Sequence, residues 1–77
     1  MNWQERITVD PAVCHGKACI KGTRVMVSVV LDNLAAGESN EEIAAAYRLA
    51  PEDIRAALLY VSELTKERVL PLGAIAE

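Results

Sequence analysis

The segment from Gly16 to Val27, GKACIKGTRVMV, constrains the fold of this 77-residue chain more than any other. Glycines at 16 and 22 enclose a short apolar segment, and a second apolar run follows at 25–27. Glycine is used where the backbone needs a positive φ, and apolar segments between turn residues are typical of short strands. We therefore expect a compact strand–turn–strand element here, followed directly by a helix.

The residues before this segment predict its partner strand. Residues 6–10 alternate polar and apolar side chains, which is the period of a half-buried strand, and Pro11 ends the run. After a turn at 12–16, a second strand at about 18–21 returns beside the first. Two strands alone are marginal in water, so either the helices cover this hairpin or a second subunit extends it. Residues 1–5 are expected to form a loose end.

Three helices are expected in the rest of the chain. Ser28 is placed to cap the first, and Gly37 to end it. Ser39 and Glu42 have the spacing of a capping box at the start of a second helix over 39–47.

The third helix is expected to begin at Pro51, because a proline at the first helical position loses no hydrogen bond. Its apolar period runs from Ile54 to Leu64, and we expect the helix to reach about residues 66–68. Taken together, the inner faces of the three helices are predicted to carry Val30, Leu31 and Leu34; Ile43 and Tyr47; and Ile54, Ala57, Leu58, Val61 and Leu64.

These elements predict a mainly α (α+β) fold in which a short N-terminal β-hairpin precedes a three-helix bundle. We expect one domain over 1–77, with the hairpin region at 6–27, the bundle at 28–68 and an apolar tail at 69–77. The second and third helices with their tight turn span about twenty-two residues, the size of a DNA-binding helix-turn-helix.

Charge is unevenly distributed along the chain, whose net charge is −3. Residues 1–27 carry four basic and two acidic groups, whereas 28–65 carry two basic and seven acidic groups. The basic groups near Gly16 are either a solvated turn or a surface for a polyanion or acidic partner. Glu52 and Asp53 would repel phosphates at the start of the third helix. The candidate nucleic-acid contacts are Lys17, Lys21, Arg24, Arg48 and Arg55.

Apolar residues make up 52% of this small chain, which suggests a homodimer. Residues 69–76 are uncharged and lack a helical period. They either fold back on the domain or, as we prefer, lie on another chain. The candidate partner-binding residues are Val69, Leu70, Leu72 and Ile75.

Several function classes find no support in the sequence. No apolar run approaches a membrane span, so we expect a cytoplasmic protein without a membrane partner, in which Cys14 and Cys19 are reduced thiols. With His15 they provide three candidate ligands, too few for a structural zinc site. His15 has no acid or base partner, so we expect no enzymatic activity, metal, cofactor or small-molecule substrate.

The phrases ITVDP at 7–11, GKACIKGTRVMVSVVLDNLAAGESNEEI at 16–43 and YRLAPEDIRAALLY at 47–60 carry a family resemblance. Over roughly residues 7 to 61 the chain resembles the bacterial domain-of-unknown-function family 433. The resemblance implies a homeodomain-like three-helix fold and a likeness to VapB-type antitoxins, which are often encoded beside a PIN-like toxin.

The sequence therefore predicts a binding protein. By resemblance, it is an antitoxin-like protein of a type II toxin–antitoxin system that neutralises a PIN-like ribonuclease toxin and contacts operator DNA as a dimer. The alternatives are a stand-alone transcriptional regulator and a dimeric adaptor without a DNA role.

Overall fold

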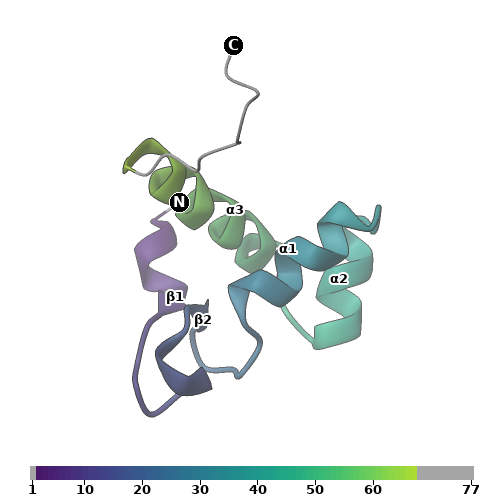
Figure 1. Cartoon of the computed structure of the whole chain (residues 1–77). Helices are drawn as coiled ribbons and strands as arrows, with labels where there is room; N and C mark the ends of the chain where they lie inside the picture. The colour runs from purple at the N-terminus through teal and green to yellow at the C-terminus, as the bar shows by residue number, and fades with distance from the viewer. Residues whose placement is uncertain (1, 68–77) are drawn as a thin grey trace.

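The computed structural model of the chain describes residues 2–67, and these form a mostly helical α+β domain (Figure 1). A short hairpin lies beside three helices, as the sequence predicts. The elements in chain order are η1 (Trp3–Glu5), β1 (Ile7–Thr8), η2 (Cys14–Gly16), β2 (Cys19–Ile20), α1 (Val27–Ala35), α2 (Asn40–Tyr47) and α3 (Pro51–Glu67), where η denotes a short 3-10 helix.

The hairpin is antiparallel, with Ile7 opposite Ile20. Each strand is only two residues long, shorter than expected. After β1 the chain turns at Asp10, whose carboxylate accepts the N–H of Ala12 and whose carbonyl accepts the N–H of Val13, both at 2.8 Å. After β2 it turns again, and the N–H of Thr23 donates to the carbonyl of Ile20 at 3.0 Å. Ile7 and Ile20 are 9% and 2% exposed and belong to the same apolar cluster as the helices. The helices therefore cover the hairpin, which is the first of the two alternatives.

The prediction of a loose N-terminal end is wrong for the residues that the structure describes. Asn2 caps η1 through its side chain, which accepts the N–H of Gln4 at 3.2 Å. η1 places the indole of Trp3 edge-on to the ring of Tyr60, with 5.6 Å between centroids and 63° between planes. Such aromatic pairs are favourable beyond their buried area, so the N-terminus packs on α3.

The start of α1 differs from the prediction. Met26, not Ser28, occupies the N-cap position, and no side chain caps this end. The N–H of Val27 instead donates to the carbonyl of Ala18 at 3.0 Å, so the loop beside β2 satisfies one of the free N–H groups of the first turn. Ser28 consequently lies exposed inside the helix.

The junction between α1 and α2 follows the sequence signals. Gly37 has a left-handed φ of 98°, and the N–H of Glu38 reaches the carbonyl of Asn33 at 3.1 Å, as in a Schellman motif. In the capping box, the N–H of Ser39 donates to Glu42 at 2.8 Å and the N–H of Glu42 donates to the Ser39 hydroxyl at 3.1 Å. Both predictions are confirmed.

The core lies where the three helices meet the hairpin. Tyr47 and Leu58, expected inside, are 36% and 42% exposed, and their places are taken by Leu49 and by Ala56, which is fully buried. Small side chains at 56 and 57 allow the other elements to approach α3 closely. The buried apolar side chains are Ile7, Cys19, Ile20, Val27, Val30, Ile43, Ala44, Leu49, Ile54, Ala56 and Ala57.

Asp53 joins the beginning of α3 to the hairpin. Its Oδ2 accepts the N–H of Ala50 at 3.0 Å, and its Oδ1 accepts Nη1 of Arg6 at 2.9 Å. The first contact satisfies a backbone donor at the helix start, where Ala50 has no side chain that can cap. The second joins segments 47 residues apart in sequence, with the Asp53 side chain only 14% exposed.

We predict that Asp53→Ala lowers the free energy of unfolding by about 1–2 kcal/mol, because it removes a cap and leaves Arg6 without its acceptor. Urea denaturation followed by circular dichroism measures the change. Glu52→Ala is the matched control: it removes an exposed acid from the same helical turn, and we expect a change within about 0.5 kcal/mol. Equal effects of the two substitutions would contradict this role for Asp53.

Candidate nucleic-acid interface

The helix pair α2–α3 has the form of a helix-turn-helix. Arg48 follows α2 with a left-handed φ of 58°, and this lets the N–H of Leu49 reach back to the carbonyl of Ala44 at 2.8 Å. The turn is completed by Ala50, and α3 begins at Pro51, as predicted. Figure 1 shows α2 and α3 joined by this short connection, with α1 beside them.

The outer face of α3 near its beginning is available to a partner. Glu52, Arg55 and Leu58 are exposed there, at intervals of three residues along the helix. Together with Pro51 and Asn40 at the start of α2, they line a shallow hollow of about 310 Å³. A guanidinium beside an exposed apolar side chain suits a base edge and a thymine methyl group in a major groove.

The sequence argument that Asp53 repels phosphates needs correction. Its carboxylate is turned toward Arg6 and the Ala50 N–H, and both of its oxygens are engaged. Its charge is therefore balanced at close range, which leaves Glu52 as the exposed acid of the first turn of α3. No local sequence pattern predicts this pairing, because Arg6 lies in the hairpin region, 47 residues from Asp53.

The predicted basic residues near Gly16 line two different hollows. Lys21 and Arg24 line a common hollow of about 520 Å³ with Thr8, Val13, Gly22 and Thr23. Lys17 lies elsewhere, in a hollow of about 280 Å³ that Tyr60 and neighbouring residues of α1 and α3 also line. Gly22 has a φ of 81°, so the turn between the two basic groups depends on glycine.

Arg48 and Arg55 are thus placed by the helix-turn-helix, Lys21 and Arg24 by the hairpin, and Lys17 by a third region. All five side chains are exposed. The structure groups them into separate regions, and only the pair on the hairpin lies together in one hollow.

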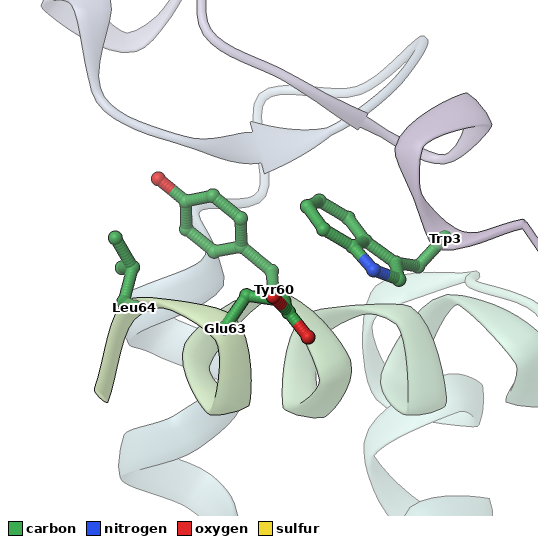
Figure 2. Close-up of a pocket in the computed structure, with 4 residues that line it drawn as sticks. All are labelled: Trp3, Tyr60, Glu63 and Leu64. Carbon is green, nitrogen blue, oxygen red and sulfur yellow. The ribbon is translucent and has the colours of Figure 1, made fainter. Parts of the chain in front are cut away.

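A further hollow, which sequence reasoning missed, lies between η1 and the second half of α3. Trp3, Tyr60, Glu63 and Leu64 line it around a volume of about 240 Å³. Figure 2 shows the indole and phenol rings next to each other above the α3 ribbon. In the sequence, only the isolated tryptophan at position 3 could have indicated this hollow. The packing of η1 on α3 is what brings Trp3 to Tyr60.

Both cysteines are free thiols. Burial raises the pKa of the Cys19 thiol, and a hydrogen bond and the charge of Cys14 raise it further. Within residues 2–67, no three or more His, Cys, Asp or Glu side chains are grouped so that they could hold a metal ion. The predicted partner-binding residues Val69, Leu70, Leu72 and Ile75 lie outside the described residues.

Among the helices of residues 2–67, none has the length and apolar character that a bilayer crossing requires.

Comparison with known proteins identifies the family. The family described as "Protein of unknown function (DUF433)" matches residues 7–61, so the chain belongs to this family. The structure is similar to that of a DUF433 member protein from Anabaena variabilis, with a TM-score of 0.74 and 32% identity over 83% of this chain and 64% of that chain. It is also similar to Rv2018 from Mycobacterium tuberculosis, with a TM-score of 0.65 and 30% identity over 73% of this chain and 27% of that chain.

The chain thus spans under two thirds of the first of these proteins and about a quarter of the second. A search among curated proteins found no significant match.

Substitution of Arg48 by glycine distinguishes two roles for this position: the left-handed backbone conformation of the turn, or the charged side chain. A left-handed φ costs a non-glycine residue about 1–2 kcal/mol, and glycine removes this cost. The gain is partly offset because glycine loses more conformational entropy on folding. We therefore expect Arg48→Gly to leave the free energy of unfolding unchanged or raise it by up to about 1 kcal/mol. The control Arg55→Gly, inside α3, should lower it by about 1 kcal/mol. Urea denaturation measures both, and a clear loss of stability in Arg48→Gly would show that its side chain supports the turn.

Proposed function

We propose that this chain is an antitoxin-like DNA-binding protein, without enzymatic activity, that acts as a homodimer. Its helix-turn-helix contacts operator DNA, and its apolar C-terminal tail binds a PIN-like ribonuclease toxin. The observation that carries the DNA-binding part is the outer face of α3. It presents Arg55 and Leu58 directly after a tight turn, while the nearby Asp53 is engaged with Arg6.

Electrostatics favours a modest affinity for each subunit. Glu52 remains exposed beside Arg55, and the chain as a whole has a net charge of −3. Two subunits double the number of phosphate and base contacts and fix the spacing of two half-sites. The proposed homodimer therefore accounts for specific binding by an acidic protein whose basic groups are few.

The toxin-binding part is proposed from the sequence of the tail and from the family resemblance. Val69, Leu70, Leu72 and Ile75 are four large apolar side chains within a run of eight uncharged residues, 69–76. Burial of such a side chain against a partner contributes about 1.5–3 kcal/mol before the cost of ordering the segment is subtracted. An extended segment on a sheet edge or in a groove suits this composition.

Arg55 is the residue on which the DNA-binding proposal is tested. Arg55→Gln should weaken binding to the DNA upstream of the gene by about 1–3 kcal/mol and relax its sequence preference, because a bidentate base contact is lost. Lys66→Gln is the matched control: it removes one positive charge from the far end of the same helix, where Lys66 pairs with Glu63 at 3.1 Å.

Fluorescence anisotropy over a range of salt concentrations measures both variants. We expect the control to bind as the unmodified protein does. Lys21→Gln should reduce the slope of log binding constant against log salt concentration by about one, because one phosphate contact is lost. Unchanged affinity and sequence preference in Arg55→Gln would remove α3 as the reading helix.

The tail is tested by truncation after Arg68. We expect the shortened protein to keep its helical circular dichroism and its DNA binding, because within residues 2–67 the three helices and the hairpin share one buried apolar cluster. We expect it to lose neutralisation of a co-expressed toxin. Growth rescue measures the second property. Retained rescue would show that the tail is not the toxin-binding element, whereas DNA binding with no toxin encoded beside the gene would favour a stand-alone regulator.

A further inference from the structure

The two cysteines converge on one short segment of backbone. The Cys14 thiol donates to the carbonyl of Arg24 at 3.3 Å, and the Cys19 thiol donates to the carbonyl of Thr23 at 3.6 Å. The two acceptors are consecutive carbonyls. A side-chain hydrogen bond between the two thiols brings the sulfur atoms into contact beside the Thr23–Arg24 segment. The contact between the thiols also raises the pKa of Cys19.

The environments of the two thiols differ. Cys19 is fully buried in β2, and this burial raises the pKa of its thiol above the ordinary value. Cys14, in η2, is partly exposed. An oxidant in solution therefore reaches Cys14 first, and Cys19 is placed to react next. A solvent-accessible cysteine beside a second, resolving cysteine is the arrangement that redox-sensitive pairs use.

The backbone between the cysteines is held in an unusual conformation. Cys14, His15 and Gly16 have consecutive left-handed φ angles of 52°, 55° and 81°. Two of these three residues carry side chains, for which this region is unfavourable. Such conformations persist where the surroundings impose them, and they cluster at functional positions. Here the conformation directs the Cys14 sulfur toward Arg24 and Cys19.

We propose that Cys14 and Cys19 are a reversible oxidation site that forms an intramolecular disulfide in response to hydroperoxides. The Cys14 thiol gives up its proton, and the thiolate attacks the peroxide oxygen. The O–O bond breaks, the leaving alkoxide or hydroxide takes up the released proton, and a sulfenic acid and an alcohol, or water, are formed. The Cys19 sulfur then attacks the sulfenic sulfur, and the S–O bond breaks. The leaving hydroxide takes the Cys19 proton and departs as water, and a dithiol reductant restores both thiols.

Disulfide formation removes both thiol donors from the Thr23 and Arg24 carbonyls. These two residues line the hollow that also contains Lys21, so oxidation changes the basic surface of the hairpin. The helices do not depend on these two hydrogen bonds. We therefore expect the effect to be local, and a consequence for DNA binding rests on the proposed function.

Thiol titration under denaturing conditions tests the site directly. After one equivalent of hydrogen peroxide, the unmodified protein should pass from two free thiols per chain to none, with the mass loss of two hydrogen atoms and no covalent dimer; dithiothreitol should restore both thiols. Sulfinic or sulfonic acid at Cys14 with Cys19 still reduced, or a disulfide between two chains, would overturn the proposal.

Two further measurements separate the steps. In Cys19→Ser, Cys14 should accumulate as a sulfenic acid that dimedone traps, because the resolving thiol is missing; absence of the adduct in folded protein would contradict the assigned order. By NMR, oxidation should shift amide signals in residues 13–27 and leave those of α2 unchanged.

DNA binding by the oxidised protein is measured separately. Oxidation should weaken the affinity for DNA only if the hairpin contacts DNA. If the protein does not bind DNA at all, the proposed function is wrong, but the thiol titration still decides whether the disulfide forms.

Discussion

The contact between Arg6 and Asp53 is the interaction on which the arrangement of the domain depends. A single carboxylate caps the beginning of α3 through Ala50 and holds the guanidinium that precedes β1. The hairpin and the longest helix are therefore fixed to each other at the same place where the helix-turn-helix turn ends. Because the Asp53 side chain is largely buried, water screens this contact less than it screens the exposed Lys66–Glu63 pair.

This contact also changes the electrostatic character of α3. Two acidic residues in a first helical turn favour the helix dipole but oppose an approaching phosphate. With Asp53 neutralised by a residue from the hairpin, the exposed surface carries one acid and one arginine rather than two acids and one arginine. The proposed reading face is thus a product of tertiary structure, and its remaining acidity explains why a dimer is part of the proposal.

The hairpin region has a structural role and also contains the two free thiol groups of the domain. Ile7, Cys19 and Ile20 anchor it in the core, and the Val27 N–H donates to Ala18, which replaces a side-chain cap at the start of α1. The connection between the strands instead follows a path with three consecutive left-handed residues and two thiols over neighbouring carbonyls. Glycine, sulfur and positive charge are therefore concentrated in the part of the domain that is least regular.

The sequence by itself determined the features that depend on local rules. The capping box at Ser39 and Glu42, the glycine at 37, the proline at 51 and the apolar period of α3 each act within one or two helical turns, so their outcome did not depend on the rest of the chain. Tertiary structure decided the rest. It buried Leu49 and Ala56 in place of Tyr47 and Leu58, and it placed Lys17 in a different hollow from Lys21 and Arg24. It also paired Arg6 with Asp53 and packed Trp3 on Tyr60. Each of these outcomes depends on which distant segment of the chain occupies the neighbouring volume.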